Sequence, residues 1–260
     1  MSSGTGPLVI KGVRRLGAIL CFGAALTVAG CQATDTDDPP ETSKPLKVEH
    51  ALGTTKVPGQ AKRPVALYPS ELDDALALGV TPAGAAGGAL PRYLGDRTRT
   101  IRLVGPVPRP DLALIQSLEP DVILSTKRGQ GRLYRRLRRI APTVAIDERV
   151  DWKPNLRQDG EALGHPDEAE HLLNRYDRKA ALVRRLIRSR GAPLLPPAVR
   201  RALSRPFVAS VMDDVGLPHP RPRDDLLPGA RPGPFDAWTL GIGYLAATRI
   251  LADLMRFSAR

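Results

Sequence analysis

Few residues of this 260-residue chain have types and spacings that could do chemistry. The four histidines are scattered, and His165 and His171 are six residues apart, a spacing that does not place both on one helical face. Tandem aspartates occur at 73-74, 213-214 and 224-225, but neighbours in a helix point to different sides, so we expect them to be solvated. The chain has no glycine-rich phosphate loop, G-x-S-x-G motif or paired-histidine metal motif. The sequence therefore predicts neither an enzyme nor a metal site.

One cysteine stands where a covalent modification is expected. Cys31 follows residues 16–30, an uncharged run with Lys11, Arg14 and Arg15 before it. A basic segment, a short apolar run and small residues are typical of an export signal, and the run is shorter than the about 20 residues of a membrane span. The stretch LTVAGC resembles a bacterial lipobox, in which the thiol is alkylated with diacylglycerol and becomes the new N-terminus. We expect a signal peptide at 1–30 and lipidation of Cys31. The protein would then lie on the extracytoplasmic face of the cell membrane, and an uncleaved anchor would also leave it outside the membrane and tethered to it.

The rest of the N-terminal region limits what the mature protein can contain. Cys21 lies within the apolar run and would leave with the signal, so no internal disulfide or cysteine-based metal site can form. We expect no cofactor. Residues 31–47 are rich in Pro, Asp and Thr and have little to bury, which predicts a flexible tether.

The net charge of +12 indicates an anionic partner or a bias of composition. An anionic ligand or an anionic membrane would fit such a charge. Nucleic acid is a common partner of basic proteins, but an exported lipoprotein rarely meets it, so we expect none. A general bias towards Arg, Ala and Pro is the alternative, because the arginines are spread along the chain.

Alternating strand and helix patterns predict an α/β lobe at 48–150. Short apolar strands are expected at 62–67, 101–105, 121–125 and 143–147, with amphipathic helices between them. In the first helix, Ser70 and Asp73 match a capping box, and Gly79 marks the end. Strands and helices that alternate at this spacing favour a parallel sheet.

The second half of the chain is dominated by one helical region. Apolar residues recur at three- and four-residue spacing through 151–190, which predicts a long helix, kinked or interrupted near Gly164. Residues 191–260 hold two helical stretches, 207–217 and the closing segment from Trp238, separated by a proline-rich loop. This segment is short for a second lobe, so its helices could pack on the first lobe instead.

These pieces, in this order, resemble a known family. The stretches VEHALGTTKVPGQAKRPVAL, DDALALGVTPAG, PDLALIQSLEPDVILS, RRLRRIAPTV, WKPNLRQDGEALGHPDEAEHLLNRY, FVASVMDDVGLPHP and WTLGIGYLAATRILADL are similar to the iron-siderophore substrate-binding lipoproteins of bacterial ABC transporters, which have vitamin B12- and haem-binding relatives. The resemblance implies a periplasmic-binding-protein fold of two α/β lobes joined by a single long helix, here with the second lobe truncated. It implies no chemistry, and a ligand held between the lobes.

The resemblance also implies ligand-binding positions. The loop after Gly105 and the loop TKRGQG, which follows the strand at 121–125, fall where the family lines its cleft. Tyr68 lies where a strand of an open α/β sheet ends, the edge at which such sheets bind ligands. Two tryptophans match family positions near the hinge and in the second lobe. The residues expected to contact a ferric siderophore are Tyr68, Arg109, Lys127, Arg128, Trp152 and Trp238.

Two departures from the family pattern keep its function open. The family docks on its permease through one exposed Glu per lobe, but the first of these positions is Ala113 here, and Asp111 nearby could substitute only partly. The second position belongs to a stretch that is shortened to RPRDDLLPGARPGPFDA. We therefore keep three possibilities: a monomeric siderophore-binding lipoprotein of an ABC importer, a degenerate member without transport activity, and a tethered lipoprotein that uses the scaffold to bind a partner.

Overall fold

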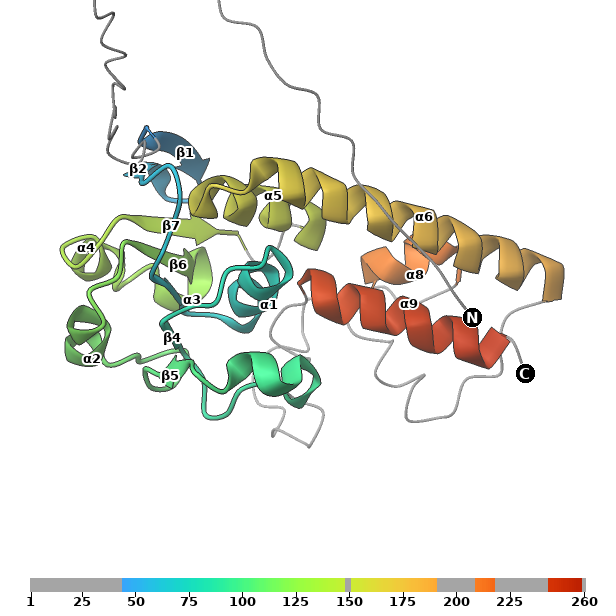
Figure 1. The fold of residues 1–260 in the computed structure, drawn as a ribbon, viewed down its shortest axis with the longest axis horizontal. Helices are drawn as coiled ribbons and strands as arrows, with labels where there is room; N and C mark the ends of the chain where they lie inside the picture. Colours follow the sequence, from blue (N-terminus) through green and yellow to red (C-terminus); the bar gives the residue numbers. More distant parts are fainter. Residues whose placement is uncertain (1–43, 148–150, 191–208, 218–242, 259–260) are drawn as a thin grey trace, which may run out of the picture. The chain divides into compact units, whose positions relative to one another are not determined.

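The computed structural model describes residues 44–147, 151–190, 209–217 and 243–258 (Figure 1). All of them belong to one compact unit, Glu41–Arg260. The predicted signal peptide, the predicted lipidation site Cys31, most of the predicted tether and Trp238 lie outside the described residues. Among the residues described, no helix is long and apolar enough to cross a membrane.

An antiparallel hairpin opens the described chain. Strand β1 (Leu46–His50) pairs with β2 (Gly53–Val57). Val48, Thr55 and Val57 are buried on its inner face. The hairpin begins within the range that we assigned to the tether.

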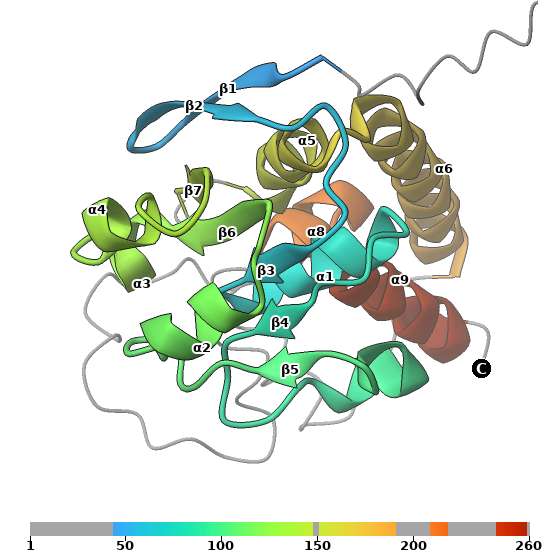
Figure 2. The same ribbon diagram turned by 60° about the vertical axis from the view of Figure 1, so that its left-hand side comes forward.

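A five-stranded parallel sheet forms the centre, in the order β5-β4-β3-β6-β7 (Figure 2). Its strands are β3 (Pro64–Ala66), β4 (Gly84–Ala85), β5 (Arg102–Leu103), β6 (Val122–Thr126) and β7 (Thr143–Ile146). The helices around it are α1 (Pro69–Ala77), the 3-10 helix at Arg92–Thr98, α2 (Leu112–Ser117), α3 (Lys127–Gln130) and α4 (Tyr134–Leu137). The predicted α/β order is confirmed. Four elements differ from the prediction: β4 and the 3-10 helix were not among the predicted elements, α3 lies where we expected a loop, and α4 is only four residues long.

Side chains that alternate along β6 bury both faces of the sheet. Ile123 packs in one apolar cluster with Ile115 of α2. Val122 and Leu124 point the other way and join a larger cluster that includes Leu156. Successive residues of a strand face opposite sides, and a parallel sheet is normally covered on both. All five residues of β6 are therefore buried, the polar Ser125 and Thr126 included, because the strand has no solvent face.

The long helical region predicted at 151–190 consists of two helices. Helix α5 (Trp152–Leu163) ends at Gly164, which has a left-handed φ of 81°, and α6 (Pro166–Arg190) follows. A Cβ at Gly164 would lie 2.1 Å from the backbone oxygen of Gly59, so only glycine fits this turn. The predicted interruption near Gly164 is confirmed.

The described residues after Arg190 form two helices and no strand. Helices α8 (Ala209–Val215) and α9 (Tyr244–Ser258) share one apolar cluster with α5, α6 and the sheet. Val211, Leu251 and Leu254 are fully buried in it. Helix α9 thus packs on α1 of the first lobe as well as on α6, as the shortness of the C-terminal segment suggested, whereas α8 contacts α6 and α9.

The N-terminus of α9 is held by two carboxylates of α1, where we expected solvated side chains. Asp74 accepts a hydrogen bond from the Tyr244 N–H at 2.8 Å. Asp73 accepts from Leu245 N at 2.6 Å and from Ala246 N at 3.1 Å, and both aspartates are fully buried. The first N–H groups of a helix lack partners within the helix, so a carboxylate placed there satisfies them and complements the helix dipole. The two aspartates are α9's cap.

The capping box proposed for α1 is therefore wrong. The N-cap of α1 is Tyr68, without a side-chain cap, and Pro69 begins the helix. Ser70 donates a hydrogen bond to Glu71 at 2.8 Å. Asp73 is committed to α9 and cannot serve its own helix.

Candidate functional site: the carboxyl edge of the sheet

Three loops meet where the parallel strands end. The chain leaves β3 at Tyr68, β5 at the loop after Gly105 and β6 at helix α3. The carboxyl ends of parallel strands lie at one edge of a sheet, which is where open α/β sheets bind ligands. The predicted positions at Tyr68, Arg109, Lys127 and Arg128 therefore share this edge.

Gln130 joins the three loops, a role that was not predicted from the sequence. Its amide nitrogen donates to Leu67 O at 3.2 Å and to Val107 O at 2.9 Å. Its amide oxygen accepts from Thr126 N at 3.0 Å. Only 1% of Gln130 is exposed. A buried amide that satisfies three backbone groups fixes the loops relative to one another, so the edge is preformed.

Helix α3 begins with a side-chain cap that positions the two predicted basic residues. Thr126 Oγ1 accepts from Gly129 N at 2.9 Å, which closes the turn. A Cβ at Gly129 would lie 2.5 Å from that oxygen. Lys127 and Arg128 are exposed on this turn, and Lys127 forms an ion pair with Asp147 at 3.9 Å. The threonine before a glycine-containing turn is the signal that could have predicted α3.

A groove of about 460 Å³ opens beside this edge. Its lining residues are Pro108, Arg109, Pro110, Asp111, Leu112, Ala113, Leu133 and Arg136. Arg109 and Arg136 are both exposed, so they supply guanidinium groups that suit carboxylate or other oxygen-rich ligands. Asp111 is less available, because its carboxylate caps α2 by accepting from Ala113 N at 2.9 Å and Leu114 N at 3.1 Å.

Trp152 lies in the core, so the structure does not support its predicted contact with ligand. It is 4% exposed and packs edge-on against Tyr176, with ring centroids 4.8 Å apart. The backbone N–H of Trp152 donates to Asp151 at 2.7 Å, which begins α5. Packing the large Trp152 ring against Tyr176 stabilises the protein more than exposing the ring to solvent would. The resemblance to the family suggested a role for Trp152 but did not indicate whether its side chain is buried.

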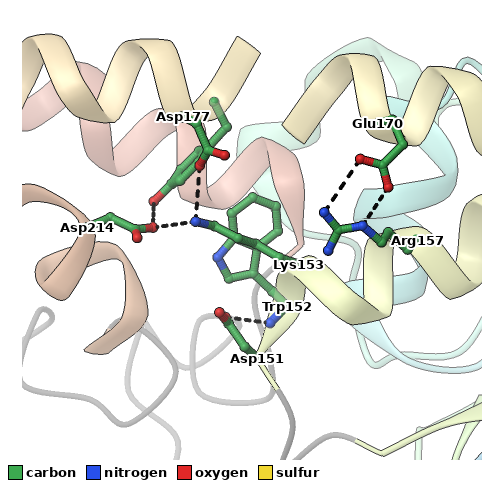
Figure 3. A network of polar contacts seen from close by, with 8 residues as sticks. Asp151, Trp152, Lys153, Arg157, Glu170, Asp177 and Asp214 are labelled. Atoms are coloured by element: carbon green, nitrogen blue, oxygen red, sulfur yellow. Dashed lines mark hydrogen bonds and ion pairs between the residues drawn. The ribbon is translucent and has the colours of Figure 1, made fainter. Parts of the chain in front are cut away.

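A polar network next to Trp152 ties together α5, α6 and α8 (Figure 3). The Lys153 ammonium lies 3.1 Å from Asp177 and 2.9 Å from Asp214. Tyr176 donates its hydroxyl hydrogen bond to Asp214 at 2.9 Å. Burial lowers the pKa of Lys153, but its hydrogen bonds to the two aspartates outweigh that effect and raise the pKa overall. Asp214 is therefore a bridging residue, whereas we expected it to be solvated.

The described residues contain no group of three or more His, Cys, Asp or Glu side chains that could hold a metal ion. What the edge offers instead is a preformed surface with arginine and lysine side chains. Such a surface can bind an oxygen-rich or anionic molecule.

Comparison with known proteins identifies the fold family. Residues 65–206, more than half of the chain, match the periplasmic binding protein family. The chain is 30% identical over 166 residues to the probable siderophore-binding lipoprotein YfiY of Bacillus subtilis (strain 168), which covers 61% of this chain and 51% of that protein. The chain spans about half the length of the curated relatives it matches.

Solved structures agree with this assignment. Staphylococcus aureus SirA complexed with staphyloferrin B has a TM-score of 0.58 and 29% identity, with 68% of this chain and 65% of that chain covered. Holo-ViuP has a TM-score of 0.63 over 81% of this chain and 94% of that chain, and its 17% identity makes it a likeness of fold alone. The family consists of substrate-binding proteins, not enzymes. This chain belongs to the periplasmic binding protein family.

Proposed function

We propose that the protein is a lipid-anchored, monomeric solute-binding protein that captures a ferric siderophore for an ABC importer. The observation that carries the proposal is the meeting of Arg109, Lys127 and Arg128 at the carboxyl edge of the sheet, on loops that Gln130 fixes in place. Ferric siderophores are often anionic or rich in oxygen. Forked guanidinium donors and an ammonium suit such ligands. The names of relatives that bind siderophores support the same ligand class.

A pair of matched variants tests the site. Arg109→Gln removes a guanidinium from the groove, and Arg102→Gln removes an exposed one from β5 outside the proposed site. A hydrogen bond to a charged group contributes about 1.5–3 kcal/mol, so Arg109→Gln should weaken siderophore affinity roughly 10- to 150-fold. Arg102→Gln should leave the affinity unchanged in isothermal titration calorimetry. If both variants bind the siderophore with the same affinity as the parent protein, Arg109 is not part of the binding site.

A second candidate function is a tethered lipoprotein that uses the scaffold to bind another partner. The observation that favours it is at the start of α2, where Ala113 stands at the position at which the resembled family carries its docking Glu. Asp111 does not replace that Glu freely, because two backbone N–H groups already occupy its carboxylate. Ala113→Glu separates the candidates. In a transporting protein it should strengthen binding to the cognate permease, whereas a protein that has left transport should show no permease binding with either residue.

A further inference from the structure

The outer side of helix α6 is basic over its C-terminal half. Arg175, Arg178, Leu182 and Arg185 recur at three- and four-residue spacing and are exposed, so they form one stripe along the helix. Arg188 is also exposed, towards one side of that stripe. Leu182 lies in the middle of the stripe and is 53% exposed.

The carboxylates of α6 do not neutralise this stripe. Asp167, Glu168 and Glu170 lie in the first two turns, and Glu170 is paired with Arg157 of α5. Asp177 is paired with Lys153, also of α5. Within the described part of the chain, Arg178, Arg185 and Arg188 have no carboxylate partner, so their charges face solvent.

The hairpin β1–β2 adds a second basic surface. Lys47 and Lys56 are directly opposite each other across the strand pair, and both are exposed. Like charges in this arrangement are unfavourable by themselves, so a nearby anionic partner would relieve their repulsion. Lys44, where the described chain begins, is exposed beside them.

Helix α5 connects the two basic surfaces. Its Gln158 donates to the backbone oxygen of Glu49 in β1 at 2.6 Å, and its Arg157 is paired with Glu170 of α6. In both ribbon views α5 lies between the hairpin and α6 (Figures 1 and 2). The stripe and the lysine pair therefore belong to one side of the molecule, which we call the basic side. It comprises Lys44, Lys47, Lys56, Arg175, Arg178, Leu182, Arg185 and Arg188.

We propose that the basic side binds the anionic phospholipid headgroups of the membrane to which the protein is tethered. Lysine and arginine side chains near an anionic bilayer each contribute about 1 kcal/mol, or roughly fivefold in affinity. An exposed leucine among them suits the boundary between headgroups and acyl chains.

The position at which the N-terminal segment joins the folded unit favours a lipid surface over other anionic partners. The chain that follows Cys31 enters the described residues at Lys44, within the basic side and just before β1. Thirteen steps of extended chain span at most about 45 Å, so a lipid on Cys31 would keep this side at high local concentration near the bilayer. A weak electrostatic contact is then sufficient to orient the protein. The proposal goes beyond ligand capture and does not depend on which solute is bound.

Vesicle co-sedimentation tests the proposal on residues 32–260, which contain the whole compact unit and lack the apolar leader. The vesicles are phosphatidylglycerol and phosphatidylcholine in equal parts, or phosphatidylcholine alone. We expect binding to the anionic vesicles only. Raising the salt from about 0.1 M to about 1 M should abolish it, because the Debye length falls from about 10 Å to about 3 Å.

Two triple variants with the same charge change locate the surface. R178Q/R185Q/R188Q alters α6, and R132Q/R135Q/R139Q alters exposed arginines on and around α4. The α6 variant should lose roughly 100-fold in vesicle affinity, and the α4 variant no more than a few-fold. Siderophore affinity and circular dichroism should be unchanged in both, so failure of this proposal and failure of the proposed function can be told apart. Equal losses in the two variants, or no binding of the parent protein to anionic vesicles, would overturn the proposal.

Discussion

The buried carboxylates that hold α9 make the stability of the protein depend on pH in an unusual direction. Asp73 is fully buried, and loss of hydration raises its pKa from 3.8 to about 6, although hydrogen bonds from Tyr93 and from the N-terminus of α9 oppose the shift. Burial also raises the pKa of Asp74, with Asp159 and Asp73 adding repulsion. We therefore predict that the folded protein gains stability as the pH falls from about 8 to about 5, and that Asp73→Asn reduces this gain.

The sign and size follow from the pKa of Asp73. A carboxyl whose folded pKa lies above its unfolded value binds protons more tightly in the folded state, so its cost to stability is absent below pH 3.8 and complete above about pH 6. About 2 pKa units correspond to roughly 3 kcal/mol, and about half of that cost arises between pH 5 and pH 8. Asp73 alone should thus contribute about 1–2 kcal/mol to the difference between these two pH values.

Urea unfolding followed by circular dichroism at about pH 5 and about pH 8 measures this difference. The pKa of His50 is lowered by burial and by Arg138, so protonation of His50 removes stability as the pH falls. That effect is present in both proteins and cancels in the comparison. Asp96→Asn, at an exposed site, is the control. If Asp73→Asn and Asp96→Asn keep the same pH dependence as the parent protein, the account of the cap of α9 is refuted.

Three further substitutions test the same packing by urea unfolding. Asp159→Asn should raise the free energy of unfolding at about pH 8, because both oxygens of the Asp159 carboxylate are buried without a hydrogen-bond partner among the described residues and burial raises the pKa of Asp159. The control, Glu161→Gln at an exposed site, should leave the free energy of unfolding unchanged. A loss of stability in Asp159→Asn would contradict this reasoning. Gly243→Ala should cost about 1–3 kcal/mol, since its Cβ would lie 2.5 Å from an oxygen of the cap of α9, and an unchanged midpoint would mean that α9 is held less closely. Lys153→Met should cost about 1–3 kcal/mol, because Asp214 keeps its burial but loses its ammonium partner; a cost below about 0.5 kcal/mol would make the network incidental.

Local patterns predicted most of the scaffold. The strands at 64–66, 122–126 and 143–146 were predicted from short apolar runs, because a strand buried on both faces needs no polar position. The end of α1 near Gly79 and the break at Gly164 were predicted because glycine takes the left-handed conformation that ends a helix. These features depend on neighbours in sequence.

Contacts between distant segments were not predictable in this way. Asp73 and Asp74 look like ordinary helix-surface acids, and only the position of α9, some 170 residues later, gives them donors to accept. Gln130 is equally ordinary in sequence, and its three backbone partners come from three separate segments of the chain: the residue after β3, the loop after β5 and the end of β6. Of the site residues, Tyr68, Arg109, Lys127 and Arg128 were placed at one edge by the topology of a parallel sheet, whereas the burial of Trp152 depended on packing between α5 and α6.

The central claim is that the carboxyl edge of the sheet binds a ferric siderophore. The most direct measurement is isothermal titration calorimetry of residues 32–260 with hydroxamate, catecholate and carboxylate siderophores, each with and without iron. We expect saturable binding of one siderophore class, with a dissociation constant of about 1 μM or tighter, about −8 kcal/mol, and we expect this binding to depend on iron. No iron-dependent binding by any class, from a protein shown by circular dichroism to be folded, would contradict it.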